Sequence, residues 1–198
     1  ELMSVWQQMF SKRMLIAFIM GMASGLPLLL TGSTLQAWMR GEGVSLEGVG
    51  LVSLLGLPYT LKFLWAPLFD RFVPKYLGRR KGWLVLVQIC LAICIALVGL
   101  FNPLNSLTLL LLMAFLVAFF SSSQDIVVDA YRRESLSDEE LGLGSSLYVN
   151  GYRVAMLISG AGALILSDYM SFGFVYMCMG GVMAISALST LFADEPTI

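Results

Sequence analysis

Four ionisable side chains interrupt apolar stretches of this sequence, and their chemistry matters first. Asp125 and Asp129 stand four positions apart, and Lys62 and Arg153 lie in two other apolar segments. A charge that faces lipid at the centre of a membrane helix costs about 2.5–3.5 kcal/mol or more. All four side chains are therefore expected to face a protein interior or a water-filled cavity.

The two carboxylates share one face of a predicted helix, because four residues make about one turn. Arginines stand three and four positions after Asp129 and can neutralise it locally. Asp125 needs a partner from another helix, and Lys62 or Arg153 would supply it. These charges fit a structural latch at the cytoplasmic helix ends. Asp125 and Asp129 also fit a second role, as carboxylates that take up and release a proton during a transport cycle.

Lys62 and Arg153 lie near the middle of their predicted spans at a helix rise of ~1.5 Å per residue. Two cations at that depth either attract an anionic ligand or belong to internal ion pairs. Arginine binds carboxylates and phosphates through two parallel hydrogen bonds, so an anionic substrate fits the first reading. Neutral hydrogen bonds to such a substrate would come from six further side chains: Gln36, Tyr59, Gln88, Tyr148, Asn150 and Tyr152. These side chains also suit hydrogen bonds between helices or placement at the membrane interface.

Composition restricts the class of protein. Of the 198 residues, 58% are hydrophobic and 13% are charged, whereas soluble domains carry roughly 25% charged residues. The formal net charge of −1 gives no basis for nucleic-acid binding. The sequence has no histidine, and its three cysteines lie in apolar runs, so we expect no metal, disulfide framework or cofactor. No serine stands beside an evident general base, and we do not expect an enzyme.

The apolar segments predict an all-α integral membrane protein. A span needs roughly 20 apolar residues, and six spans are predicted, at about 14–36, 49–69, 83–101, 107–130, 142–166 and 172–193. Nine lysines and arginines fall on one side of these spans, and Arg40 alone falls on the other. The positive-inside rule therefore predicts that both termini are cytoplasmic, with residues 1–13 as the N-terminal tail.

Internal similarity indicates two three-helix repeats. The string "AFIMGMASG" in the first span resembles "AFLVAFFSSS" in the fourth. Lys62 in the second span and Arg153 in the fifth then lie at comparable depths, as repeated units would place them. Gly21 and Gly25 form a GxxxG pattern, which predicts close packing against another helix. Glycines and prolines within the spans also fit broken helices that line a pathway.

The loop after the second span, "DRFVPKYLGRRKGW", resembles the signature loop of the major facilitator superfamily. The matching positions are Asp70, Arg71, Gly78, Arg79, Arg80 and Lys81. Six residues separate Arg71 from Gly78 where the common signature has one, and Ala66 stands where that signature opens with glycine. The resemblance implies one six-helix half of a transporter, in which this motif forms a cytoplasmic gate with Arg132 and Arg133.

Five segments of the sequence carry a more specific resemblance: "ASGLPLLLTGSTLQAWM", "YTLKFLWAPLFDR", "GRRKGW", "SSSQDIVVDAYRRE" and "GYRVAMLISG". They resemble one branch of that superfamily, the AmpG-type muropeptide permeases. The resemblance implies import of anhydro-muropeptides, anionic sugar–peptide fragments of the cell wall, across the bacterial inner membrane. It also implies coupling to the proton gradient and a link to peptidoglycan recycling and β-lactamase induction. A second six-helix half would follow, with residues 194–198 at the start of the linker.

Two alternatives stay open at this point. The strings "QDI" and "VDA" in the fourth span also resemble the acetyl-CoA transporters, so another organic anion is the competing substrate. The other alternative is a membrane assembly or signalling module whose buried charges are purely structural. Such a module would not be stabilised by binding a cell-wall fragment.

Overall fold

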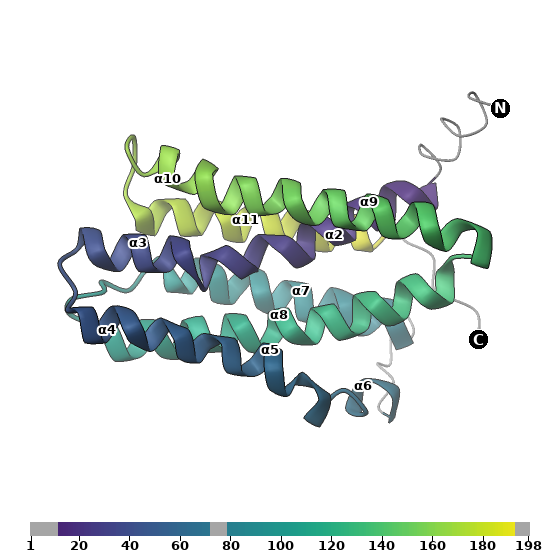
Figure 1. The fold of residues 1–198 in the computed structure, drawn as a ribbon, viewed down its shortest axis with the longest axis horizontal. Helices are drawn as coiled ribbons and strands as arrows, with labels where there is room; N and C mark the ends of the chain where they lie inside the picture. The colour runs from purple at the N-terminus through teal and green to yellow at the C-terminus, as the bar shows by residue number, and fades with distance from the viewer. Residues whose placement is uncertain (1–11, 72–78, 193–198) are drawn as a thin grey trace.

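The computed structural model describes residues 12–71 and 79–192, and every regular element within these ranges is a helix. The predicted tail up to residue 11, the linker at 194–198 and Gly78 lie outside the described residues, as do the side chains of Asp70 and Arg79. The helices run lengthwise in one bundle (Figure 1). The predicted all-α membrane fold is confirmed.

Five helical stretches of the described chain are long and apolar enough to cross a membrane. They are Lys12–Gly41, Arg80–Val98, Leu107–Ser135, Asp138–Leu166 and Phe172–Thr190. The first contains α2 (Lys12–Leu30) and α3 (Ser33–Gly41), and the next two correspond to α7 (Arg79–Val98) and α8 (Leu107–Ser135). The fourth contains α9 (Asp138–Leu157), the π-helical segment η3 (Ile158–Gly162) and α10 (Ala163–Leu166), and the fifth is α11 (Phe172–Thr190).

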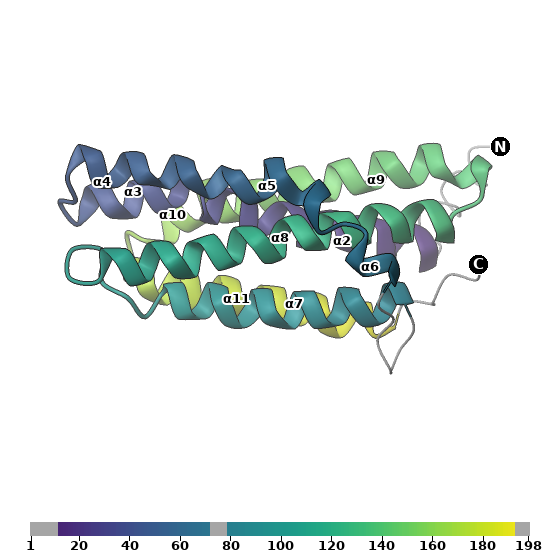
Figure 2. The same ribbon diagram turned by 90° about the horizontal axis from the view of Figure 1, so that it is seen from below.

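The second predicted span, 49–69, is a series of short helices rather than one helix, in keeping with the broken helices that its glycine and proline predicted as one possibility. It consists of α4 (Leu46–Gly50), the 3₁₀-helix η1 (Leu51–Gly56), α5 (Leu57–Leu61), the short 3₁₀-helix η2 (Lys62–Leu64) and, beyond a turn, α6 (Leu68–Arg71). Glycine is a weak helix former and proline lacks a peptide N–H, and Gly50, Gly56 and Pro58 fall at these junctions. The broken passage still runs along α8 (Figures 1 and 2).

Glycines allow a close contact between helices α2 and α9. A Cβ atom added to Gly21 would overlap the backbone carbonyl of Tyr148, and one added to Gly25 would overlap that of Tyr152. From the other side, a Cβ atom on Gly151 would overlap the carbonyl of Phe18. The two backbones can approach this closely only because these positions carry no side chain. The predicted role of Gly21 and Gly25 in helix packing is confirmed.

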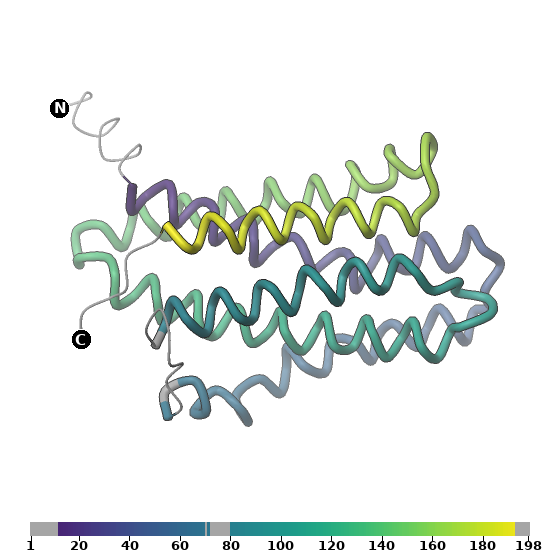
Figure 3. The backbone as a smooth tube through the Cα atoms, turned by 180° about the vertical axis from the view of Figure 1, so that it is seen from behind, coloured from purple at the N-terminus to yellow at the C-terminus, as the bar shows by residue number. Residues whose placement is uncertain are grey.

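The contacts between helices support the predicted two repeats. Helix α2 packs on α9, and correspondingly α8 packs on α5 and on the 3₁₀-helices beside it. Helix α2 also contacts α11, as α8 contacts α7. Helices α7 and α11 contact each other and lie side by side in Figure 3. If each of the first three membrane-crossing segments is exchanged with the corresponding one of the last three, the same pattern of helix contacts therefore results.

One end of the bundle carries most of the described basic residues. Helices α2, α7 and α9 begin there, and α6 and α8 end there (Figure 1). The first turn of α2 holds Lys12 and Arg13, the last turn of α6 holds Arg71, and the last turn of α8 holds Arg132 and Arg133. Arg40 lies near the end of α3, at the opposite end of the bundle.

Candidate functional site

Asp125 lies on α8 with one carboxylate oxygen buried and without a hydrogen-bond partner among the described residues. Lys62 and Asp129 lie within electrostatic range of this carboxylate, and the Ser24 hydroxyl is its close neighbour. Ser24 belongs to α2, whereas Lys62 begins η2. Three passages of the chain therefore meet at Asp125.

Buried hydroxyls without partners surround this carboxylate. Among the described residues, the side-chain oxygens of Ser24, Tyr59 and Ser121 are buried and form no hydrogen bond of normal geometry, although the Ser121 and Thr31 hydroxyls are close to Tyr59. Tyr59 lies beside Ser121 and within electrostatic range of Asp125. An unsatisfied buried polar group costs about 1–3 kcal/mol, so such groups usually bind water or a ligand. We call Ser24, Tyr59, Lys62, Ser121 and Asp125 the Asp125 cluster.

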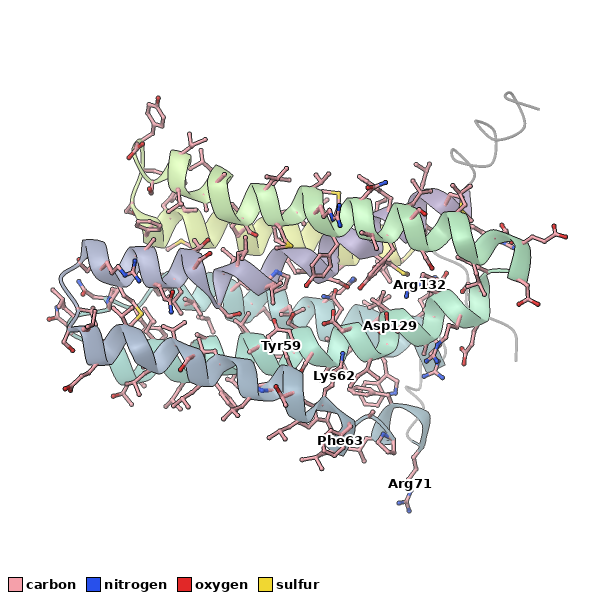
Figure 4. The ribbon with its side chains drawn as sticks, viewed as in Figure 1. Tyr59, Lys62, Phe63, Arg71, Asp129 and Arg132 are labelled. Atoms are coloured by element: carbon pink, nitrogen blue, oxygen red, sulfur yellow. The ribbon has the colours of Figure 1, made fainter. Side chains whose placement is uncertain are left out.

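Lys62 is the cation that faces Asp125. This is one of the two alternative pairings that the sequence predicted. Figure 4 shows Lys62 and Tyr59 directed from their broken passage towards α8, whereas Phe63 and Arg71 point away from the bundle. Lys62 is half-buried. None of the described carboxylates lies within 4.0 Å of its ammonium group, so no closed ion pair neutralises it there. The charge stays available to a ligand.

Arg153 does not join the Asp125 cluster, and its predicted pairing with Asp125 is wrong for this bundle. Its side chain is exposed, as is that of Asn150. Helix α9 packs on α2 through Gly151, and a residue two positions later points about 200° around the helix. Around the helix axis, Tyr148 and Tyr152 lie between the face of Gly151 and the face of Arg153. Both tyrosines lie within electrostatic range of Asp125. The exposed polar face of α9 is thus continuous with the cluster through two tyrosines.

Asp129 is neutralised by Arg132, as predicted. The Arg132 Nη2 atom donates to Asp129 Oδ1 at 3.3 Å, one helix turn away. The guanidinium also lies 4.2 Å from the ring centroid of Tyr148 on α9, within the range of a cation–π contact. Its Nη1 atom is buried and has no partner among the described residues. Arg133 instead donates to the backbone carbonyl of Asp129 at 3.4 Å.

The basic residues of the predicted gate reach different partners. Arg80 forms a two-point ion pair with Glu134, with Nε and Nη2 lying 3.0 Å and 2.9 Å from the two carboxylate oxygens. This pair joins the start of α7 to the end of α8. Arg71 is exposed on α6 and points away from the bundle (Figure 4). The sequence motif did not identify Glu134, although this residue holds Arg80 at the gate end.

Gln36 lies outside the cluster. It is half-buried on α3, twelve residues beyond Ser24, which is roughly 18 Å along a helix. A different glutamine occupies the interior: Gln124 is fully buried and immediately precedes Asp125. Gln124, Ser24 and Ser121 were not among the predicted site residues. Their signal in the sequence is weak, because uncharged polar residues also occur as ordinary packing positions in membrane helices.

The fold and the site define a class of protein: a multi-pass membrane protein whose charged side chains gather inside a helical bundle. Comparison with known proteins gives the family. The family described as the Major Facilitator Superfamily matches residues 13–198. The chain therefore belongs to the major facilitator superfamily, as the loop after the second span indicated.

Individual relatives refine this membership. The chain is 45% identical to the anhydromuropeptide permease of Escherichia coli K12 over 186 residues, which cover 93% of the chain and 38% of the permease. It is 38% identical over 170 residues to a putative transporter AmpG 1 of Rickettsia bellii, covering 84% of the chain and 42% of that protein. An uncharacterised Haemophilus influenzae protein is 45% identical over 196 residues, covering 98% of the chain and 46% of that protein.

The chain spans less than half the length of these relatives. The resemblance to AmpG-type permeases that the five sequence segments carried is confirmed by these identities. The named relatives are a permease and a transporter, not enzymes.

Proposed function

We propose that the full-length protein containing this chain imports anhydro-muropeptides from the periplasm into the cytoplasm of a bacterium, coupled to proton entry. The observation that carries this proposal is the 45% identity to an anhydromuropeptide permease over 93% of the chain. In this role the protein supplies cell-wall fragments for peptidoglycan recycling and for β-lactamase induction. No cofactor is required, because the proton gradient drives uptake.

An anionic substrate fits the charges of the site. Lys62 is half-buried, faces α8 and has no ion-pair partner within 4.0 Å among the described carboxylates. Arg132 keeps one buried guanidinium nitrogen free of described hydrogen-bond partners. A peptide carboxylate would satisfy both groups, with charge-assisted hydrogen bonds of about 1.5–3 kcal/mol each. Tyr59 of the cluster and its neighbour Tyr152 would bind uncharged parts of the same substrate.

The proton-coupling residue in this proposal is Asp125 rather than Asp129. Asp129 is engaged by Arg132 at 3.3 Å, and 43% of its side chain is exposed. Asp125 instead has a buried oxygen without a described partner, beside hydroxyls that are also unsatisfied. A carboxylate in such surroundings changes its proton affinity when a cation, a substrate or water enters or leaves. Substrate binding at Lys62 would therefore alter the charge that Asp125 experiences.

The second six-helix half of the full-length protein is the proposed partner of the exposed polar face. Arg153 and Asn150 are exposed at membrane depth on α9, where contact with lipid is costly. A second half packed over this side would enclose Arg153, Asn150 and the Asp125 cluster in one substrate path. The basic end of the bundle is proposed to face the cytoplasm of the bacterial inner membrane, following the positive-inside rule.

Uptake into right-side-out membrane vesicles from cells that express the full-length protein tests this function. Labelled anhydro-muropeptide should accumulate above the level of vesicles without the protein, and a protonophore should abolish the accumulation. Labelled acetyl-CoA is the parallel substrate, and its preferential uptake would favour the organic-anion alternative. No uptake of either compound, with verified insertion in the membrane, would support a non-transport module and reject the proposal.

A further inference from the structure

Pro27 interrupts the hydrogen bonding of α2 without ending the helix. Helix α2 continues through Pro27 to Leu30. Proline has no peptide N–H, so the carbonyl of Ala23, four residues earlier, loses its donor within the helix. Ala23 and Pro27 are both buried. A carbonyl without a partner is costly inside a membrane, where water is scarce, and another group must donate to it.

The side-chain amide of Gln124 supplies that donor from α8. Its Nε2 atom donates to the carbonyl oxygen of Ala23 at 2.9 Å, and Gln124 is 0% exposed. The hydrogen-bond chain continues away from α2. Gln124 Oε1 accepts from Gln88 Nε2 at 3.0 Å, and Gln88 Oε1 accepts from the Thr190 hydroxyl at 2.6 Å. This series of hydrogen bonds thereby connects α2, α8, α7 and α11.

The Ala23 carbonyl determines which groups donate and which accept in this series of hydrogen bonds. A carbonyl oxygen only accepts hydrogen bonds, so Gln124 must present its NH₂ group there and its oxygen to Gln88. Gln88 must then donate to Gln124 and accept from Thr190. Each amide has one arrangement that satisfies its neighbours, which gives a buried network a single well-defined geometry.

We infer that Gln124 replaces the peptide N–H that Pro27 lacks, and that this bond fixes the rotation of α8 so that Asp125 faces Lys62. Consecutive residues on a helix point about 100° apart. With Gln124 held against Ala23 and Gln88, the side chain of Asp125 is directed towards the second passage of the chain. Gln124 is therefore a positioning residue. The bond to Ala23 is independent of the proposed function, whereas its effect on transport rests on that function.

A double-variant cycle tests the bond in the purified full-length protein. Gln124→Met keeps the side-chain size and removes the donor to Ala23, so the midpoint of thermal unfolding should fall. Pro27→Ala restores a peptide N–H at position 27, which can donate to the Ala23 carbonyl. Pro27→Ala alone will shift the midpoint of the wild type by some amount. When it is added to Gln124→Met, the midpoint should rise by that amount and, in addition, by about half of the decrease that Gln124→Met caused. The other half belongs to Gln88, which still lacks its acceptor.

Gln88→Met is the matched control, because it disturbs the same network without touching Ala23. Pro27→Ala should give Gln88→Met no recovery beyond its effect in the wild type. Equal rescue of both glutamine variants, or rescue of neither, would overturn the replacement of the Pro27 N–H. If the Gln124→Met protein does not accumulate in membranes, the amount of protein in the membrane is measured with and without Pro27→Ala. Equal rescue of both glutamine variants, or rescue of neither, then again overturns the replacement.

The positioning of Asp125 has a separate readout, the pH profile of uptake. The Gln124→Met/Pro27→Ala protein, which regains part of its stability, should show a pH profile displaced from that of the wild type, because Gln124 no longer connects α8 to α2. An unchanged profile in this double variant would overturn the positioning role. A wild type without any uptake would instead reject the proposed function, and would leave the result of the unfolding cycle intact.

Discussion

Arg80 and Glu134 are 54 residues apart in sequence and form a two-point ion pair, with donor–acceptor distances of 3.0 and 2.9 Å. The Arg80 side chain is only 8% exposed. Charge-assisted pairs with two parallel hydrogen bonds are stronger than single contacts. Because the pair connects α7 to α8, it stabilises the end of the bundle where the predicted gate lies.

Replacing Arg80 should therefore destabilise the protein more than replacing an exposed arginine. Arg80→Gln should lower the free energy of unfolding by about 1.5–3 kcal/mol, the value of hydrogen bonds to charged groups. Arg13→Gln is the matched control. Arg13 pairs with Glu140 at 2.9 Å, but its side chain is 60% exposed, so the expected loss is about 0–1 kcal/mol. Denaturant unfolding of both variants in detergent checks this, and equal losses would contradict the assigned role of Arg80.

The contact between α2 and α9 predicts opposite effects for two glycine-to-alanine changes. In Gly21→Ala, the new methyl group would overlap the backbone carbonyl of Tyr148, so the helices must separate at a cost of about 1–3 kcal/mol. In Gly181→Ala, the new methyl group has no described atom within 4 Å beyond the adjacent backbone of its own helix. Removing a helical glycine there should instead stabilise by about 0.5–1 kcal/mol. Thermal unfolding gives the sign of each change, and a stabilising Gly21→Ala would contradict the close approach.

Lys62 should contribute selectively to the binding of anions. Loss of one charge-assisted contact of about 1.5 kcal/mol corresponds to roughly a tenfold weaker affinity. Lys62→Gln should therefore weaken binding of an anhydro-muropeptide about tenfold and leave binding of a neutral disaccharide analogue nearly unchanged. Arg40→Gln, which removes an exposed cation at the opposite end of the bundle, is the control. Calorimetric titration of the full-length protein distinguishes the cases, and an equal loss for both ligands would reject the assignment.

Several parts of this arrangement could be predicted because they depend on local spacing. The GxxxG pattern at Gly21 and Gly25 identified a packing face, and the interval of three residues identified the Asp129–Arg132 pair. Helix geometry makes such relationships almost independent of the rest of the fold. The apolar lengths likewise predicted helices that cross a membrane, and Gly50, Gly56 and Pro58 fit the series of short helices in the second span.

Other parts depend on rotations and contacts that spacing does not determine. Lys62 and Arg153 are predicted at similar depths, yet of these two cations only Lys62 is turned towards Asp125. The depth of a residue follows from its position in a span, whereas the direction of its side chain follows from how that helix packs. Glu134 and Gln124 were missed for the same reason, since their partners lie on other helices. Pro27 did carry a usable signal, because a proline inside a membrane helix requires an outside donor.

Proton coupling at Asp125 predicts different outcomes for substitutions at the two carboxylates of α8. Asp125→Asn removes the titratable group, whereas Asp129→Asn removes a group already paired with Arg132. Asparagine has nearly the same size, so both variants should still bind substrate. Exchange of labelled for unlabelled substrate across the membrane needs no net proton movement and should persist in both.

The most direct measurement is accumulation of anhydro-muropeptide by proteoliposomes of the full-length protein under an imposed pH gradient. If Asp125 carries the coupled proton, Asp125→Asn abolishes gradient-driven accumulation while exchange continues, and Asp129→Asn retains accumulation. Accumulation by Asp125→Asn at the wild-type level would contradict this role of Asp125.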